Sequence, residues 1–233
     1  MRAFAALLLK EEKALFSSPI AYVIIAVFLL LMGYTFTVAL FLSRVASLVH
    51  LFFQMYVLFL LMVPVITMRL VAEERKLRTM EVLLTAPVTE VQVVMAKFVA
   101  SLSLILLMVV LSGSYAVVLG LFGEPDWGPI YSGYLGLVLL GSALVSLGLL
   151  MSSLTENQIV AALLALGLFL FLWIVDDFGY LLPEPLDTVF VNMSLSVHFV
   201  PFATGSLYLS DAGYYVSLTL LGLFLSVHAL ARR

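Results

Sequence analysis

Six long stretches without Asp, Glu, Lys or Arg constrain this chain more than any other feature of its sequence. Each can form a helix across a bilayer, which needs about 20 apolar residues. They are Ile20–Leu42, Leu51–Met68, Phe98–Phe122, Ile130–Thr155, Gln158–Val175 and Tyr214–Ala231. Their apolar residues are continuous rather than alternating, which argues against an outer-membrane β-barrel. The sequence therefore predicts an all-α, polytopic membrane protein with six transmembrane helices, forming one transmembrane domain over residues 1–233.

Composition supports this class and excludes several others. Hydrophobic residues make up 64% of the 233 residues and charged residues only 11%, whereas soluble domains average about 45–50% and 25%. An ordinary soluble enzyme, a coiled coil and a disordered chain are therefore excluded. The net charge of −3 gives no indication of a nucleic-acid partner. The absence of cysteine excludes disulfides, thiolate catalysis and Cys-ligated metals.

Lys and Arg are distributed asymmetrically around the six stretches. Ten of the eleven fall on the side that an even number of spans assigns to both termini: Arg2, Lys10, Lys13, Arg69, Arg75, Lys76, Arg78, Lys97, Arg232 and Arg233. Cytoplasmic loops are rich in these residues, so we expect a multi-pass protein of the inner (cytoplasmic) membrane with both termini in the cytoplasm. Arg44 is expected at the outer rim, either paired with a carboxylate or lipid phosphate or simply solvated.

Two segments outside the six stretches are too apolar to be free loops. Residues 2–16 place their apolar side chains on one stripe, which predicts an amphipathic helix on the inner membrane surface, ended by Ser17-Ser18-Pro19. This helix is either an interfacial anchor or a docking element. Residues 176–213 contain no Lys or Arg and three prolines. They favour short re-entrant helices that dip into the outer leaflet before the last span, with a plain extracellular cap as the alternative.

The segment from residue 70 to residue 90 has a third pattern, in which charged and apolar residues alternate at helical spacing. Glu74 and Arg78 are four residues apart, and Arg78 and Glu81 are three apart, as in helical ion pairs. An apolar stripe runs beside them, formed by Leu77, Met80 and Leu84. Helices that lie on lipid are rich in Lys and Arg. Here acidic and basic residues balance, which favours a helix that binds a soluble protein partner.

The sequence contains no recognisable catalytic motif. It has no Gly-x-x-x-x-Gly-Lys-[Ser/Thr], so the chain is not expected to hydrolyse ATP. Ion-coupled transporters usually carry an ionisable residue in mid-membrane, and none is visible in these stretches except His228 near the end of the last one. We therefore predict no catalytic, cofactor-binding or metal-binding residue, and a transport subunit rather than an enzyme.

Residues 72–88 read Ala-Glu-Glu-Arg-Lys-Leu-Arg-Thr-Met-Glu-Val-Leu-Leu-Thr-Ala-Pro-Val. They resemble the cytoplasmic loop of permease subunits of type-2 ATP-binding-cassette exporters, particularly the gliding-motility and nitrous-oxide-reductase-maturation branch. The family pattern is roughly Glu-Glu-[Lys/Arg]-x-x-Gly-Thr-[Ile/Leu/Met]-Glu-x-Leu-Leu-x-x-Pro-Val. Arg78 stands where the family commonly has Gly. The N-terminal entry through Ser17-Ser18-Pro19, the six-span plan and residues 202–211 before the last span are similar to the family as well.

The resemblance implies that the chain is the membrane half of an ATP-driven exporter. Residues 73–86 would be a coupling helix held in a groove of a separate ATPase, and residues 2–16 a connecting helix beside it. The implied docking residues are Glu73, Glu74, Arg75, Leu77, Arg78, Thr79, Met80, Glu81, Leu83, Leu84, Pro87 and Glu156. The ATPase would hold ATP and Mg²⁺, with no cofactor on this chain. Two permease chains, identical or related, would form the substrate route between their first, second and fifth spans.

Two other functional classes stay open on the sequence alone. One is a channel or secondary transporter that works without ATP, and the other is a structural membrane anchor for a periplasmic assembly. A periplasmic auxiliary protein and membrane lipid are further candidate partners. The sequence does not indicate the substrate.

Overall fold

The computed structural model describes residues 2–43, 46–79, 88–179, 181 and 183–231. Every regular element in these ranges is a helix, and the predicted all-α fold class is confirmed. The helices are α1 (Arg2–Phe16), α2 (Pro19–Ser43), α3 (Val49–Thr67), α4 (Ala72–Lys76), α6 (Glu90–Phe122), α7 (Trp127–Leu154), α8 (Gln158–Gly179), α9 (Leu186–Asn192), α10 (Leu195–Thr204) and α11 (Leu209–Ala231). Six are long and apolar enough to cross a membrane, namely α2, α3, α6, α7, α8 and α11.

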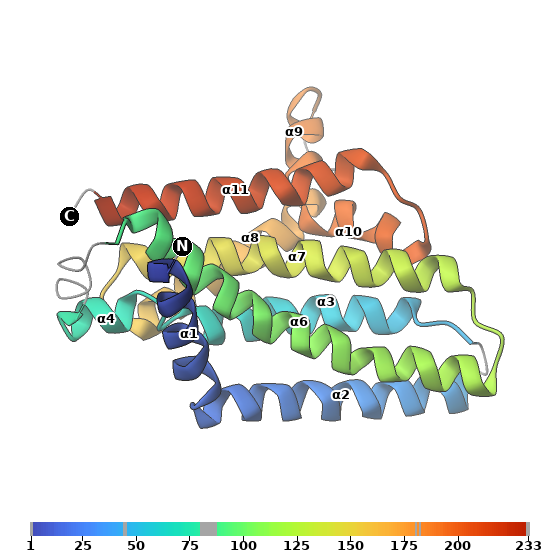
Figure 1. Cartoon of the computed structure of the whole chain (residues 1–233). Helices are drawn as coiled ribbons and strands as arrows, with labels where there is room; N and C mark the ends of the chain where they lie inside the picture. Colours follow the sequence, from blue (N-terminus) through green and yellow to red (C-terminus); the bar gives the residue numbers. More distant parts are fainter. Residues whose placement is uncertain (1, 44–45, 80–87, 180, 182, 232–233) are drawn as a thin grey trace.

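The long helices lie side by side as a bundle, with α1, α4 and the last turn of α11 together at one end (Figure 1). We call this the basic end, because the described Lys and Arg residues from α1, from the residues around α4 and from the start of α6 gather there. The α6–α7 and α10–α11 connections lie at the opposite end (Figure 1). The two ends of the chain are therefore on the same side of the bundle, as six spans require.

Helix α7 lies at the centre of the bundle and packs against α3, α6, α8, α10 and α11. Glycines on several of its faces let these neighbours approach closely. A Cβ atom at Gly141 would lie 2.7 Å from Ile105 of α6, and one at Gly148 would collide with the Thr67 side chain of α3. Small residues promote this kind of close helix packing in membranes, where there is little hydrophobic force between helices.

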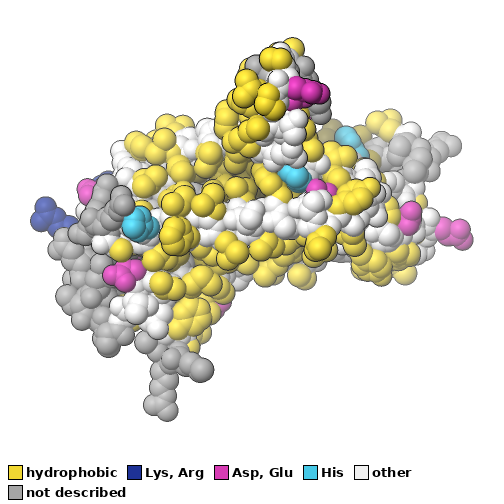
Figure 2. Space-filling model, turned by 90° about the horizontal axis from the view of Figure 1, so that it is seen from above, with side chains coloured by type: hydrophobic (Ala, Val, Ile, Leu, Met, Phe, Trp, Pro, Cys, Tyr) yellow, Lys and Arg dark blue, Asp and Glu magenta, His cyan; other side chains and the backbone are white. Residues whose placement is uncertain are grey.

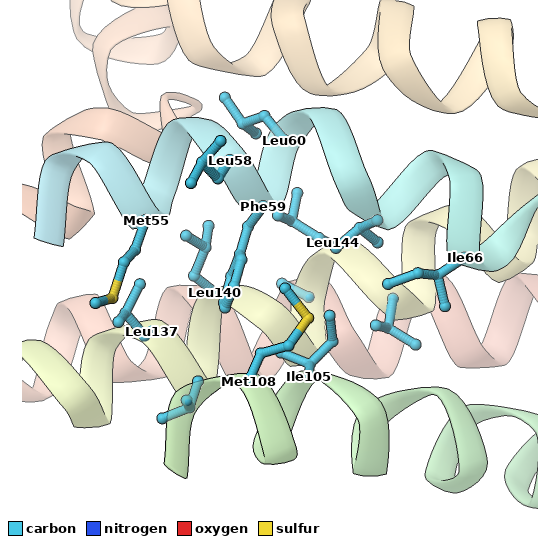
Figure 3. Packing of buried hydrophobic residues seen from close by; sticks show 14 of the residues in the cluster. Met55, Leu58, Phe59, Leu60, Ile66, Ile105, Met108, Leu137, Leu140 and Leu144 are labelled. Atoms are coloured by element: carbon cyan, nitrogen blue, oxygen red, sulfur yellow. The ribbon is translucent and has the colours of Figure 1, made fainter. Parts of the chain in front are cut away.

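The core lies mainly between α3, α6 and α7, where Phe59, Met108 and Leu140 meet in Figure 3. The outer surface is also apolar. Figure 2 shows a face covered by hydrophobic side chains, with most Lys, Arg, Asp and Glu near the two ends and on the projecting segment around α9. Val27, Leu163 and Phe224 are examples of exposed apolar residues on three different spans. Apolar residues inside and outside fit a bundle surrounded by lipid rather than water.

Three spans extend four or more residues beyond the stretches that hydropathy predicted, into segments that contain charged residues. Helix α6 starts at Glu90, eight residues before the predicted Phe98, after a capping box between Thr89 and Gln92. Helix α8 continues past Val175 to Gly179. Helix α11 starts at Leu209 rather than Tyr214, and its Asp211 lies 2.8 Å from Nδ1 of His198.

The segment before the last span contains two short helices, in line with the short helices that the sequence favoured there. Helices α9 and α10 are bent by 57° relative to each other, as in a re-entrant loop or a broken span. Helix α10 is fastened to the bundle: Ser132 of α7 donates a hydrogen bond to the Phe202 carbonyl (2.7 Å), and Tyr215 of α11 donates to the Leu195 carbonyl (2.8 Å). Helix α9 has no buried residue and projects from the bundle (Figure 1). Its insertion into the outer leaflet stays a prediction.

Candidate functional site

Four charged side chains from three helices form a cluster at the basic end. Lys97 of α6 lies 2.8 Å from Glu74 of α4 and 3.1 Å from Glu11 of α1. Lys10 of α1 contacts the same two carboxylates, at 3.1 Å from Glu74 and 3.3 Å from Glu11. We call these four residues the ion cluster. It joins the N-terminal helix, the segment around α4 and the start of a membrane span.

The ion cluster is partly buried, and it connects three helices rather than lying on the surface. The side chain of Lys97 is 2% exposed, whereas that of Lys10 is 52% exposed. A buried ammonium is stable only when carboxylates compensate its charge, and each lysine here bridges two of them. Partial burial lowers the pKa of Lys10, but the charges and hydrogen bonds of Glu74 and Glu11 outweigh it and the pKa is raised overall.

A serine of α7 caps the start of helix α4 by hydrogen bonds. Val71 is the N-cap residue of α4 and contributes no side-chain hydrogen bond. Instead, Ser152 Oγ accepts hydrogen bonds from the backbone N–H groups of Val71 and Ala72, each at 3.1 Å, and donates to the Met68 carbonyl at 3.0 Å. The hydroxyl satisfies N–H groups that every helix start leaves open. Ser152 thereby fixes the direction in which the chain leaves α3.

The structure corrects the expectation of one continuous helix over residues 73–86. Helix α4 ends at Lys76, Leu77 is its C-cap, and Arg78 has a left-handed backbone with φ of 57°. This is the position where the resembling family commonly has Gly, the residue that adopts such a conformation without steric cost. The ion-pair spacing of Glu74, Arg78 and Glu81 had suggested an uninterrupted helix. A turn at Arg78 instead separates α4 from the residues that follow.

Within residues 74–79, the predicted docking residues divide into inward-facing and exposed ones. Glu74 and Arg75 face inward: Glu74 belongs to the ion cluster, and Arg75 donates a hydrogen bond to the Ala229 carbonyl of α11 at 3.2 Å. The exposed ones are Leu77, Arg78 and Thr79, the last of which donates to the Glu74 carbonyl at 3.3 Å. Met80, Glu81, Leu83, Leu84 and Pro87 lie outside the described residues.

Two hollows flank α4. The first has a volume of about 320 Å³ and lies between α1, the turn before α4 and α6, lined by Glu11, Leu15, Arg69, Glu73 and Leu77 among others. The second, of about 450 Å³, is lined by Lys76, Leu154, Thr155, Glu156 and Asn157. It brings the short α7–α8 turn, and with it Glu156, beside the end of α4. Residues far apart in the sequence thus form one surface at the basic end.

Comparison with known proteins identifies the class of molecule that carries this surface. The family model described as ABC-2 family transporter protein matches residues 54–217, more than two thirds of the chain. The chain belongs to the ABC-2 transporter family. No curated protein matches this sequence.

Members of the ABC-2 family are membrane subunits of transporters that work with an ABC ATPase and generally lack an ATPase site of their own. The resemblance inferred from residues 72–88 is therefore confirmed at the level of an ABC-2 permease, and the narrower branch stays a prediction. The matched range of this permease includes α4 and its flanking turns. It leaves out α1, α2, the first residues of α3 and the part of α11 beyond residue 217.

Lys97, Glu11, Lys10 and Ser152 of this ABC-2 permease were not among the predicted site residues. A signal for Lys97 was present, since it directly precedes the long apolar run that begins at Phe98. A lysine at that position needs a partner if the helix continues through it. No such signal existed for Ser152, because serine is common in transmembrane helices and its partners are backbone groups some 80 residues away.

Proposed function

We propose that this ABC-2 permease is the membrane-spanning subunit of an ATP-driven exporter of the gliding-motility and nitrous-oxide-reductase-maturation branch. It resides in the inner membrane with both termini in the cytoplasm. Residues 73–86 and Glu156 dock a separate ABC ATPase, which binds ATP and Mg²⁺. The basic end, with seven described Lys and Arg residues whose side chains are placed, supports this orientation by the positive-inside rule.

The ion cluster is the observation that carries the proposal. A docking segment can transmit force to the membrane only if it is joined firmly to a span. Glu74 is joined to α6 through the buried Lys97 and to α1 through Lys10. Ser152 holds the same segment to α7, and Arg75 holds it to α11. Movement of the ATPase would thus reach three spans through short polar contacts.

The exposed residues next to these joints are suited to contact the ATPase. Leu77 and Arg78 are exposed at the end of α4, and Glu156 is exposed across the second hollow. Apolar anchors supply most of the binding energy in protein interfaces, while charges set specificity more than affinity. Leu77 and the predicted anchors Leu83 and Leu84 would provide the affinity. Glu74 would position the segment rather than touch the partner.

A second permease chain, identical or related, would complete the transport pathway. Much of the apolar surface of α8 is exposed, including Ile159, Leu163 and Phe178, and α9 projects beyond it without a buried residue. Helix α8 packs against α3, and the family resemblance implies a substrate route between α2, α3 and α8 of the two chains. A rocking motion of two such chains is a common route to alternating access.

Co-purification with a co-expressed ABC ATPase from the same organism tests the docking surface. Leu84→Asp and Leu77→Asp should each reduce the recovered ATPase by about tenfold or more, since losing an interface hot spot costs about 2 kcal/mol. Leu207→Asp is the matched control, because Leu207 is similarly exposed but lies in the connection between α10 and α11. All three variants should insert normally into the membrane.

The outcome separates the exporter from the alternative classes. If both α4-segment variants recover the ATPase normally and hydrolysis still responds to the permease, residues 73–86 are not the coupling segment. If the wild-type permease recovers no ATPase, a channel working without ATP or a membrane anchor explains the chain better.

A further inference from the structure

A histidine bridges the break between α9 and α10. Nε2 of His198 in α10 lies 3.2 Å from the backbone carbonyl oxygen of Asn192, the last residue of α9. Nδ1 of the same ring lies 2.8 Å from Oδ1 of Asp211 in α11. The side chain of His198 is 12% exposed and that of Asp211 is 10% exposed. One partly buried imidazole ring therefore connects three helices.

The two contacts of His198 require an extra proton. A backbone carbonyl oxygen only accepts hydrogen bonds, and so does an ionised carboxylate, whereas a neutral imidazole ring carries a single N–H. A neutral His198 facing an ionised Asp211 could therefore donate to Asn192 or to Asp211, but not to both. Both contacts are hydrogen bonds when the ring is an imidazolium, because each of its nitrogens then donates. A neutral ring facing a protonated Asp211 carboxyl group holds the same number of protons and satisfies the same atoms.

Two further observations fit a positive charge on His198. The ring of Tyr214 stacks on the imidazole, with 4.0 Å between the ring centres and 21° between the ring planes, and aromatic faces attract cations. Oδ2 of Asp211 is buried and has no hydrogen-bond partner within the described residues. A buried carboxylate is costly unless a cation compensates its charge, and His198 is in contact with this one.

The helices packed against α10 supply negative charge and no lysine or arginine, since the sequence has neither between Lys97 and Arg232 nor between residues 49 and 67. Their titratable groups are His50 and Tyr56 of α3, Tyr131 and Tyr134 of α7, Asp176 and Asp177 of α8, Asp187 of α9, and Asp211, Tyr214, Tyr215 and His228 of α11. These helices thus leave the compensation of Asp211 to His198.

We propose that His198 and Asp211 form a proton-binding site that fixes the bend between α9 and α10. With the proton bound, His198 holds both Asp211 and the last carbonyl of α9. When the proton leaves, the remaining N–H stays with the carboxylate, which is the stronger acceptor, and the contact with Asn192 is lost. Histidine changes charge between about pH 5 and 8, so α9 is held at acidic pH and released at alkaline pH.

Loss of the Asn192 contact loosens α9 without detaching it. Tyr214 donates a hydrogen bond to the Met193 carbonyl at 2.6 Å, and Ser194 donates to Asp176 at 2.9 Å, so residues 193 and 194 keep their anchors. Helix α9 itself has no buried residue and packs mainly against α8. The proton therefore controls how freely α9 moves. This inference goes beyond the proposed function, because ATPase docking at the basic end does not require it.

Nitrogen-15 NMR of the purified, full-length permease locates the proton. The chain has three histidines, so His50→Gln together with His228→Gln leaves His198 as the sole histidine, with purification through a tag that contains none. We expect protons on both ring nitrogens at about pH 5.5 and on one at about pH 8.5, on either side of the range in which histidine changes charge. The proton that remains should be on Nδ1, which faces Asp211, whereas a histidine free in water keeps it mainly on Nε2.

A spin label on α9 measures the mechanical consequence. Because the chain lacks cysteine, Val189→Cys places a single label on an exposed position of α9, and Leu220→Cys places a matched control on an exposed position of α11. The ratio of mobile to immobile label at residue 189 should rise about tenfold between about pH 5.5 and about pH 8.5, the effect of losing one hydrogen bond to a charged group. The label at residue 220 should not respond.

Two substitutions separate the proton site from the packing around it. His198→Phe keeps a ring against Tyr214 but loses both hydrogen bonds, so the label at residue 189 should be mobile at both pH values. Asp211→Asn should keep it immobile at both, because the amide can donate to Nδ1 of a neutral ring and leave the single N–H of His198 for the Asn192 carbonyl. Asp177→Asn is the control, since Asp177 is an exposed carboxylate, and it should keep the pH response.

Three results would overturn the proposal. They are a remaining proton on Nε2 rather than Nδ1 at about pH 8.5, equal mobility of the label at residue 189 at the two pH values, and an unchanged pH response in Asp211→Asn. If His198→Phe does not fold, these three measurements still decide. Because the experiment contains no ATPase, they would leave the docking proposal standing, and loss of ATPase binding in the Leu77 or Leu84 variants would leave the proton site untouched.

Discussion

Lys97 occupies a position where one side chain joins three helices. Its ammonium group lies within 3.1 Å of carboxylates from α1 and α4 while its own backbone begins a membrane span. Removing the charge would leave Glu11 and Glu74 facing each other with only Lys10 between them. Breaking a buried ion pair by deleting one partner is costly, in contrast to deleting an exposed charge.

Lys97→Met should therefore lower the free energy of unfolding by about 3 kcal/mol, as measured by denaturation of the purified permease in detergent. Glu74→Gln in the same chain should recover part of this loss, because the remaining carboxylate can pair with Lys10. A loss below about 1 kcal/mol in Lys97→Met, or no recovery in the double variant, would show that the cluster does not hold the three helices together.

Lys10→Met is the control for burial, with an expected loss of at most about 1 kcal/mol because Lys10 is half exposed. Because the pKa of Lys10 is raised in the folded chain, the stability that Lys10 contributes depends on pH. It should be complete below the pKa of an unfolded lysine, about 10.4, and lost as the pH rises through the higher pKa of the folded chain. Stability of wild type and Lys10→Met should therefore converge only in strongly alkaline buffer.

Arg78 offers a second test at the scale of one residue. A left-handed backbone costs an L-residue about 1–2 kcal/mol. Gly avoids this cost in the folded chain, but its greater freedom in the unfolded chain offsets part of the gain. Arg78→Gly should stabilise the permease by about 0.5–1 kcal/mol, measured by thermal unfolding in detergent. Arg78→Ala removes the same charge but keeps Cβ, so it should give no such gain. Equal effects of the two variants would mean that the charge, not the backbone, decides stability here.

At the scale of elements, α4 is too short to be stable by itself. Five residues form barely more than one helical turn, and helices of this length depend on tertiary contacts. Those contacts come from α7 through Ser152, from α11 through the Ala229 carbonyl and from α6 through Lys97. The spans thus stabilise the proposed docking segment.

Ser152→Ala should destabilise the permease by about 1–2 kcal/mol, because two backbone N–H groups at the start of α4 would lose their shared acceptor. Ser153→Ala is the matched control: Ser153 is equally buried, but its hydroxyl only donates within its own helix, to the Leu150 carbonyl. Limited proteolysis near residue 77 should speed up in Ser152→Ala and not in Ser153→Ala. Similar effects in both variants would contradict a specific role of Ser152.

Hydropathy predicted the existence of all six spanning helices and missed several of their ends. The start at Leu209 involves a partner from another element, the His198 ring for Asp211, which no local pattern reveals. The start at Glu90 has a local signal, the capping box between Thr89 and Gln92, but the partners of Lys97, namely Glu11 and Glu74, lie on other elements. The amphipathic helix over residues 2–16 was predicted correctly, since its stripe and the Ser17-Ser18-Pro19 stop are both local signals.

At the scale of the whole molecule, those predicted docking residues that the structure describes lie at one end, but for different reasons than the sequence suggested. A regular helix over residues 73–86 would have presented one apolar face outward. The turn at Arg78 instead lets Glu74 and Arg75 point into the bundle while Leu77 stays exposed. The sequence resemblance located the segment. It could not distinguish the residues that hold it from those free to meet a partner.

The orientation of the bundle can be tested directly because the chain contains no cysteine. Single cysteines at Thr79 and Ser206, both exposed and at opposite ends, would react with a membrane-impermeant maleimide. In intact cells with a permeable outer envelope, we expect labelling of Ser206→Cys only, and of Thr79→Cys only after the inner membrane is opened. The reverse pattern would place the basic end outside and remove the basis for ATPase docking.

Helix α7 is a single helix that contacts elements at both ends of the permease. Its 28 residues span about 42 Å. Ser152 is hydrogen-bonded to the start of α4 near one end, and Ser132 is hydrogen-bonded to α10 near the other. Ser132 and Ser152 are 20 residues apart along α7, about 30 Å, so a tilt of about 5° around the Ser152 end would shift the Ser132 end by about 3 Å. A small rotation of α7 at the proposed docking segment would thus become a displacement at α10, with no side chain relaying it in between.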